Sequence, residues 1–268
     1  MTRRTKPKIA IHHFPASDSS PHPPLLFVHG AWHGAWCWQD GFIDRLNQQG
    51  FDCYAMDLRG HGESEAVNPM RWNRIADYVD DVSHAVETIG DKPILVGHSM
   101  GGFICQHINN RNVPVSGIAL IASAPQNGVW RLVLRMLVKD PLALILSFAK
   151  LSLLPVIRST HAIRDMFLDA NTPDPEVKAF GEKLIDESFL AFLDMLILDL
   201  PKRTTARPPM LVIGGEKDTV CLPSEQQSLA DYYGAACHIV EDAPHNLMSQ
   251  TKWHEVADTL AEWVKARA

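Results

Sequence analysis

The stretch that most constrains the fold of this chain is Ile94–Gly102, where an apolar run ends in the pattern Gly-x-Ser-x-Gly. The apolar run is typical of a β-strand, and Phe103–Ile108 after it has helical character. The pattern predicts a sharp strand-to-helix turn that leaves no room for side chains at Gly97 and Gly101 and exposes the Ser99 hydroxyl. The helix that begins there would direct its N-terminal amides toward negative charge beside the serine. Ser99 is therefore the candidate nucleophile.

The composition is ordinary for a globular protein and narrows the class of partner. The chain has 268 residues, of which 46% are hydrophobic and 21% charged, and this length fits one α/β core with an insertion better than two domains. A net charge of −6 gives no electrostatic reason to expect nucleic acid or an anionic membrane as partner. We therefore expect a small-molecule substrate, while the sequence leaves the oligomeric state open.

Neither a metal nor a cofactor is expected. The five cysteines are scattered and form no Cys-x-x-Cys pair, which argues against a zinc site or a disulfide framework and favours reduced thiols. The one Gly-rich turn belongs to the Ser99 pattern rather than to a phosphate-binding loop.

The sequence also predicts a cytoplasmic protein without a signal peptide or a membrane span. No apolar stretch of the kind a signal peptide needs follows the basic residues Arg3, Arg4, Lys6 and Lys8. The most apolar region, Leu132–Ile157, is interrupted by charges and prolines before it reaches the ~18 residues that cross a bilayer.

Strands and helices alternate along most of the chain. Besides the run before Ser99, apolar segments predict strands at Lys8–Phe14, Leu25–Val28, Cys53–Leu58, Ser116–Ala122, Met210–Gly215 and Ala236–Glu241. Helical spacing predicts further helices at Trp38–Gln49, Arg74–Thr88, Pro223–Tyr233 and Lys252–Ala268. This alternation implies a mostly parallel sheet, with functional groups beyond the carboxyl ends of its strands.

The alternation stops between residues 124 and 208. This segment is rich in leucine, has helical character and is broken by prolines. We interpret residues 124–208 as an inserted helical cap on a core formed by residues 1–123 and 209–268.

The base that would activate Ser99 is sought among the late histidines. A serine hydroxyl needs a base within hydrogen-bonding distance, and the turn implies the chain order serine, acid, histidine. The late candidates are His238, His245 and His254. The first falls within a predicted strand and the last within the final helix. His245 lies in a loop beyond a strand end and is the predicted base.

Asp218 is the predicted acid, because it lies in the segment Gly214–Asp218, which leaves a predicted strand end directly. Its carboxylate would hold the tautomer of His245 and stabilise the imidazolium. Glu216 is an alternative that could bond loop amides instead. Asp242 is another, although its position close to His245 in the same loop is typical of a solvated turn.

Two backbone amides are needed to hold an oxyanion. The Met100 amide comes with the turn, and the loop after Val28 should supply the second from Ala31, with Trp32 as the alternative. Trp32 and His98 are assigned to the substrate pocket rather than to the chemistry. Other histidines near these groups, such as His29, are typical of structural residues that bond loop backbone.

With these residues in view, the chain resembles the α/β-hydrolase superfamily over almost its whole length. The motifs that carry the resemblance, in the family's order, are His29-Gly30, Asp57–Ser64, Gly97–Gly102, Gly215–Asp218 and Pro244-His245. The resemblance implies an eight-stranded, mostly parallel sheet with helices on both faces and a helical cap inserted before the seventh strand.

The loop His29–Trp38 also resembles the branch that holds esterases and hydroxynitrile lyases. Two departures weigh against the lyases, which carry Lys directly after the catalytic histidine, where this chain has Asn246, and lack a methionine at the position of Met100. Serine at position 99 argues against dehalogenases and epoxide hydrolases, which have aspartate there.

The expected function is hydrolysis of carboxylic esters through an acyl-enzyme on Ser99. An apolar ester moiety would lie under the cap, whose leucines between Leu132 and Phe148 would roof the pocket, although most of them are expected to pack inside the cap. The same residues could serve carbon–carbon bond hydrolysis or a lyase reaction. A third hypothesis is a ligand-binding receptor without turnover.

Overall fold

A computed structural model describes residues 7–16, 20–111, 113–202 and 208–267. They form a seven-stranded sheet in the order β1-β3-β2-β4-β5-β6-β7, in which every neighbouring pair is parallel except β1 with β3. The strands are β1 (Ile11–Phe14), β2 (Leu25–Val28), β3 (Cys53–Met56), β4 (Ile94–His98), β5 (Gly117–Ile121), β6 (Met210–Gly215) and β7 (Ala236–Val240). The predicted α/β architecture is therefore confirmed.

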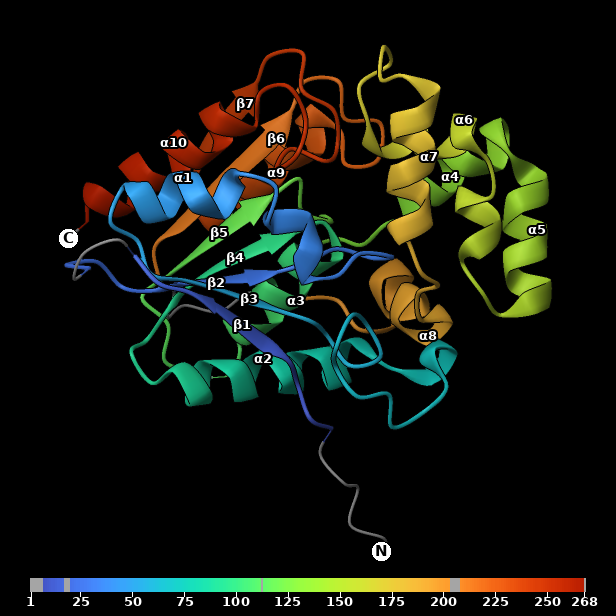
Figure 1. Cartoon of the computed structure of the whole chain (residues 1–268). Helices are drawn as coiled ribbons and strands as arrows, with labels where there is room; N and C mark the ends of the chain where they lie inside the picture. Colours follow the sequence, from blue (N-terminus) through green and yellow to red (C-terminus); the bar gives the residue numbers. More distant parts are fainter. Residues whose placement is uncertain (1–6, 17–19, 112, 203–207, 268) are drawn as a thin grey trace, which may run out of the picture.

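Helices cover both faces of the sheet (Figure 1). On one face α2 (Ile75–Ile89), α3 (Met100–Ile108) and α9 (Pro223–Tyr233) pack in one hydrophobic cluster, and on the other α1 (Phe42–Gln48) and α10 (Trp253–Lys265) pack in a second. Every residue of β2, β4 and β5 is buried, as expected for parallel strands covered on both sides. Two 3₁₀ turns, η1 (Ala35–Trp38) and η2 (Met70–Trp72), lie in the connections.

The strand count differs from the eight that the resemblance implies. The seven strands found in the described residues are those expected from the apolar segments, and the eighth was expected from the resemblance alone. The backbone before Ile11 bonds instead to the loop after β3: the Glu65 amide donates to the Lys8 carbonyl and the Asp57 amide to the Ala10 carbonyl. The helical insertion consequently precedes the sixth strand, not the seventh.

The first helix also begins later than expected. Helical spacing from Trp38 predicts a helix there, but α1 starts at Phe42. The residue before it, Gly41, has a left-handed φ of 88°, which interrupts the right-handed turn continuing from η1.

Between β5 and β6 the described chain is helical, and we call these elements the inserted helices. They are α4 (Trp130–Lys139), α5 (Pro141–Lys150), η3 (Leu154–Ile157), α6 (Thr160–Phe167), α7 (Asp174–Lys183), α8 (Phe189–Leu193) and the π-helical turn η4 (Asp194–Leu198). Figure 1 shows them at the right, where the parallel strands point. They therefore lie beyond the carboxyl ends of the strands, where a site is expected.

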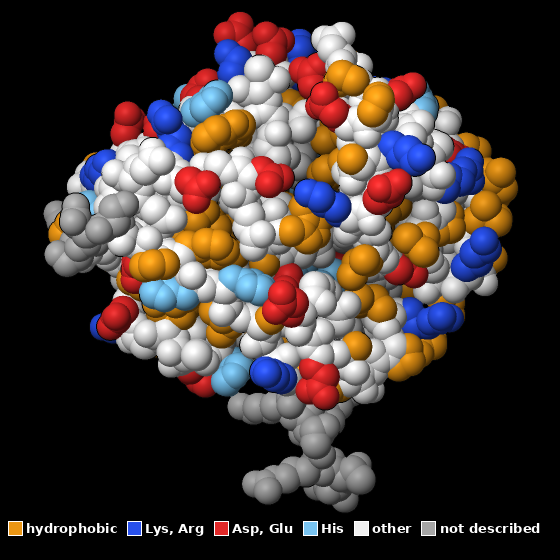
Figure 2. All heavy atoms as spheres, viewed as in Figure 1, with side chains coloured by type: hydrophobic (Ala, Val, Ile, Leu, Met, Phe, Trp, Pro, Cys, Tyr) orange, Lys and Arg blue, Asp and Glu red, His pale blue; other side chains and the backbone are white. Residues whose placement is uncertain are grey.

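The inserted helices expose more apolar surface than the sequence predicts. Leu134, Leu137 and Leu142 are each more than half exposed, although we expected most leucines of this segment to be packed. In Figure 2, hydrophobic side chains gather at the right margin of the molecule, over the position of α5 in Figure 1. None of the helices that the structure describes combines the length and hydrophobicity needed to cross a membrane.

Candidate active site

The turn after β4 has the geometry that the sequence pattern predicts. Ser99 adopts φ 52° and ψ −115°, an unusual backbone conformation for a residue with a side chain, and α3 begins at the next residue. A Cβ on Gly97 would lie 2.6 Å from the Gly101 carbonyl oxygen, and one on Gly101 would lie 2.3 Å from that of Val28. Both positions therefore require glycine.

The structure brings Ser99, His245 and Asp218 together. His245 Nε2 lies 3.1 Å from Ser99 Oγ, and His245 Nδ1 lies 2.8 Å from Asp218 Oδ2. His245 is 1% exposed and Asp218 is 2% exposed. One imidazole thus faces a hydroxyl on one side and a carboxylate on the other, which is the arrangement of a base and its orienting acid.

The carboxylate of Asp218 is fixed by more than the histidine. Its second oxygen accepts hydrogen bonds from the amides of Val220 and Cys221, at 2.8 and 2.9 Å. The alternative acids, Glu216 and Asp242, are both exposed, and Glu216 accepts a hydrogen bond from the Asp242 amide. Asp218 is therefore the carboxylate that meets His245.

His98, which we expected in the wall of the substrate pocket, is not among the residues that line it. Its ring packs against the ring of His245 instead. It is fully buried, and its Nε2 donates to the His245 carbonyl at 3.1 Å. Burial, with His245 nearby, holds the pKa of His98 well below its ordinary value. His98 is therefore a neutral support for the histidine loop, because its place as the last residue of β4 buries the ring on the sheet.

The loop after β2 runs beside Ser99. Ala31, Trp32 and Met100 all line the same pocket as Ser99. In the described part of the chain, no hydrogen bond uses the amide of Ala31, Trp32 or Met100. Met100 is the first residue of α3, so its amide also has the helix N-terminus behind it. These amides are available to an anionic oxygen.

Two neutral histidines hold the carbonyls of this loop. His29 Nδ1 donates to the Gly30 carbonyl at 2.8 Å, and His33 Nδ1 donates to the Ala31 carbonyl at 2.6 Å. Burial, with His61 nearby, lowers the pKa of His29 to about 3, and burial lowers that of His33 to about 4. Both rings are therefore uncharged donors at neutral pH. His29 has the structural role expected from the sequence, while the role of His33 was missed.

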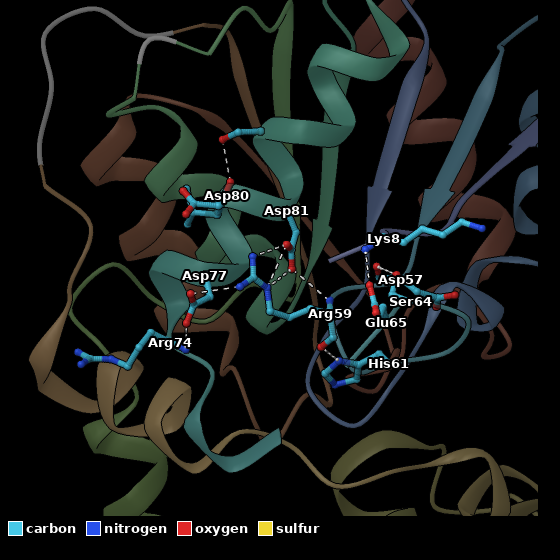
Figure 3. Close-up of polar contacts among 12 residues, drawn as sticks. Lys8, Asp57, Arg59, His61, Ser64, Glu65, Arg74, Asp77, Asp80 and Asp81 are labelled. Atoms are coloured by element: carbon cyan, nitrogen blue, oxygen red, sulfur yellow. Dashed lines mark hydrogen bonds and ion pairs between the residues drawn. The ribbon is translucent and has the colours of Figure 1, made fainter. Parts of the chain in front are cut away.

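The Asp57–Ser64 loop supports the site without contacting Ser99. Asp57 accepts hydrogen bonds from the amides of Ala35 and Glu63, and Arg59 bonds Asp81 on α2 (Figure 3). A Cβ at position 62 would lie 2.2 Å from the Asp57 carboxylate, which explains the glycine there. The motif thus anchors the loop that carries His61.

His61 joins this loop to the inserted helices through Glu187. Both side chains are fully buried, with His61 Nε2 3.1 Å from Glu187 Oε2, and Tyr78 donates to the other carboxylate oxygen at 2.8 Å. Burial opposes charge on each partner, but their mutual attraction outweighs it and raises the pKa of His61 while lowering that of Glu187. Glu187 is not predicted from the sequence, because an acid just before the helix cap Ser188 is the pattern of an ordinary helix start.

The pocket above Ser99 is narrow and apolar. Its volume is about 60 Å³, small beside the ~300–1,000 Å³ of typical ligand pockets. Beside it lies a second cavity of about 300 Å³ between α4, α5 and α6. Both cavities are lined by Leu132, Met136, Val156, Met166 and Val220. The flexible methionines among them are the side chains that can widen the inner pocket for a ligand.

One group of three potential metal ligands occurs in the described chain, namely Asp218, Cys221 and His245 within 4.8 Å of one another. The first and last are already hydrogen bonded together. Burial and the nearby carboxylate raise the pKa of the Cys221 thiol well above its ordinary range, so the thiolate that zinc prefers is disfavoured. These three side chains therefore suit a hydrogen-bonded pair of His245 and Asp218 better than a metal site.

Comparison with known proteins agrees with this architecture. Among solved structures, a monoacylglycerol lipase from Paleococcus ferrophilus superposes with a TM-score of 0.69 at 19% identity, covering 97% of this chain and 100% of that one. An esterase from Exiguobacterium antarcticum superposes with a TM-score of 0.71 at 18% identity, covering 97% and 96%. At these identities the similarity shows the fold alone.

Relatives found by sequence have a higher identity to this chain than those solved structures, but over shorter spans. The human protein phosphatase methylesterase 1 is 35% identical over 107 residues, which cover 38% of this chain. This chain spans only 28% of that protein's length. The family model described as the alpha/beta hydrolase family matches residues 25–259, which is most of the chain. This protein therefore belongs to the α/β-hydrolase family.

Proposed function

We propose that this hydrolase cleaves carboxylic esters of small molecules through an acyl-enzyme on Ser99. The observation that carries the proposal is the hydrogen-bonded series Ser99–His245–Asp218, with distances of 3.1 and 2.8 Å, at the end of an apolar pocket. The similarity to the human protein phosphatase methylesterase 1 supports the same class of reaction.

In the first step Ser99 Oγ attacks the ester carbonyl while His245 Nε2 takes its proton. Asp218 keeps the other ring nitrogen protonated and stabilises the imidazolium. The amides of Ala31 and Met100 hold the negative oxygen of the tetrahedral intermediate, and His29 fixes the peptide that carries the Ala31 amide, because it donates to the Gly30 carbonyl. His245 then protonates the leaving alkoxide.

In the second step water attacks the acyl group on Ser99. His245 accepts a proton from that water and returns a proton to Ser99 Oγ as the carboxylic acid leaves. The reaction needs no further reactant than water.

We further propose that residues 124–208 act as a cap on a core formed by residues 1–123 and 209–268. Residues of this segment supply most of the pocket lining, including Leu132, Leu144 and Phe148. Residues 203–207 of the proposed cap lie outside the described part of the chain. Because the inner pocket is small, the cap side chains must move for an ester to enter.

The test is hydrolysis of p-nitrophenyl esters from acetate to palmitate by the wild type and by Ser99→Ala. We expect turnover to peak at one chain length and to fall by about 10⁴-fold or more in the variant, with an unchanged fold by circular dichroism. Ser83→Ala on α2 is the matched control and should keep full activity.

Two results would contradict the proposal. Esterase activity that survives in Ser99→Ala would remove Ser99 from the mechanism. If no ester is cleaved although a fluorophosphonate labels Ser99, the nucleophile serves another bond, and cleavage of β-diketones and of cyanohydrins should be measured next.

A further inference from the structure

Ser147 on α5 has a buried hydroxyl at the apolar pocket that makes no hydrogen bond within the described chain. Ser147 belongs, with Ala143 and Leu144, to the buried side of α5, and it lines the same pocket as Ser99. The residue is 1% exposed, and within the described chain its Oγ makes no hydrogen bond. A buried hydroxyl without a partner costs folding free energy, so its position calls for an explanation.

The local helix does not provide one. A serine in the middle of a helix commonly donates to the carbonyl four residues earlier. Ser83 on α2 does so, because its Oγ donates to the Val79 carbonyl at 2.7 Å. Ser147 has the Ala143 carbonyl at the same spacing but makes no such bond. Its hydroxyl therefore remains available to a molecule in the pocket.

The chemistry of the lining limits what that molecule offers. Only Trp32, Ser99 and Ser147 carry side-chain nitrogen or oxygen among the lining residues. Trp32 Nε1 is also buried and without a partner among the described residues, and an indole N–H can only donate. No lining residue is charged. A neutral oxygen acceptor, such as a carbonyl or an ether, is the group that suits these donors.

We propose that the substrate is an ester whose apolar moiety carries a second neutral oxygen acceptor, away from the scissile carbonyl, which accepts a hydrogen bond from Ser147. This inference rests on the proposed ester hydrolysis and names its substrate class. Ser99 and the loop amides act on the scissile ester at the sheet side of the pocket. Ser147, on the inserted helices, holds the remote oxygen and sets specificity.

The test compares p-nitrophenyl octanoate with its 4-, 5-, 6- and 7-oxo derivatives in the wild type, Ser147→Ala and Ser147→Cys. Oxo-octyl acetates extend the series to an oxygen in the alcohol moiety. We expect one position of the ketone to raise kcat/KM in the wild type relative to the plain ester. This ratio should fall about tenfold in Ser147→Ala, the loss expected for one hydrogen bond.

The two variants separate hydrogen bonding from shape. Ser147→Cys keeps a side chain of similar size but only a weak donor, so its ratio should fall nearly as far. Plain octanoate should be hydrolysed somewhat faster by Ser147→Ala, because an unsatisfied hydroxyl is removed from an apolar wall. Ser83→Ala should leave both rates unchanged. A ratio that is equal in the wild type and Ser147→Ala at every ketone position would overturn the inference.

Binding of 2-octanone, measured as a rise in the unfolding temperature, distinguishes this inference from the proposed reaction. If esters are not cleaved but the stabilisation by 2-octanone depends on Ser147, the ester reaction is wrong and the subsite stands. If esters are cleaved through Ser99, but neither the kcat/KM ratio nor the stabilisation by 2-octanone changes in Ser147→Ala, the reaction stands and the subsite is wrong.

Discussion

In two regions of this molecule a histidine is buried against a carboxylate, and only one of these two histidines contacts a candidate nucleophile. At the carboxyl ends of the strands, His245 lies 2.8 Å from Asp218. At the junction between the sheet and the inserted helices, His61 lies 3.1 Å from Glu187. All four side chains are almost completely buried, so burial and pairing alone do not distinguish them.

The second ring nitrogen makes the difference. His245 Nε2 faces the Ser99 hydroxyl, which can give up a proton, whereas His61 Nδ1 lies 3.3 Å from the Arg59 carbonyl, which cannot. The first pair can therefore move a proton in a reaction. The second pair can only hold two segments together, because both ring nitrogens are occupied by fixed acceptors. The comparison predicts that the first pair controls rate and the second controls stability.

The largest expected effect is on the rate. Asp218→Asn should lower kcat for the best p-nitrophenyl ester by about 10⁴-fold, because the amide no longer stabilises the imidazolium or the required tautomer. Glu187→Gln is the matched amide substitution at the other pair and should lower kcat less than tenfold. Steady-state kinetics on both variants tests this, and equal losses would show that the two pairs are not functionally distinct.

The next effect is on stability. Glu187→Gln should lower the free energy of unfolding by about 3–5 kcal/mol, because it removes the carboxylate that pairs with the buried His61 ring and raises its pKa. Urea unfolding measures the loss. A double-mutant cycle with His61→Gln separates the pair from its surroundings, and the double variant should be more stable than the sum of the single losses predicts. Strict additivity would mean that the two groups are not coupled.

The same pair predicts how stability changes with pH. The pKa of His61 is raised in the folded protein, so its contribution is complete below about pH 6.5 and is lost as pH rises through the folded pKa. The pKa of Glu187 is lowered, so its contribution is present above its ordinary value and lost in acid. The free energy of unfolding should therefore decrease from pH 6.5 upward, and the contribution of His61 to this decrease is at most ~1.4 kcal/mol per pH unit. Glu187→Gln should flatten that slope, and an equal slope in both proteins would assign it to other groups.

An exposed pair gives the smallest effect. His238 Nε2 lies 2.8 Å from Glu255 Oε1, but both side chains are about two-fifths exposed. Solvent screening limits such a pair, so Glu255→Gln should change the free energy of unfolding by less than about 1 kcal/mol, without affecting kcat. A loss as large as that of Glu187→Gln in the same urea experiment would show that burial is not what separates these pairs.

Local patterns were enough to predict the scaffold and to nominate the site. The strand at Met210–Gly215 and the helix at Pro223–Tyr233 occur with the predicted bounds, because apolar runs and helical spacing are properties of neighbouring residues. The candidates Ser99, Asp218 and His245 each follow a strand in sequence, and a parallel sheet brings such positions to one edge. Their mutual distances still came only from the structure.

What the sequence determined by itself is thus the α/β architecture, the glycine-dependent turn at Ser99 and the family, because short-range sterics and periodicity specify them. Only the tertiary structure decided that His98 supports the histidine loop instead of lining the pocket, and that Glu187 is a buried anion. It also decided that Ser147 lies in an apolar wall without a partner. The physical reason is that the charge and hydrogen bonding of a polar side chain depend on what surrounds it. Its surroundings come from segments far apart in the chain, as for His61 and Glu187, which are 126 positions apart.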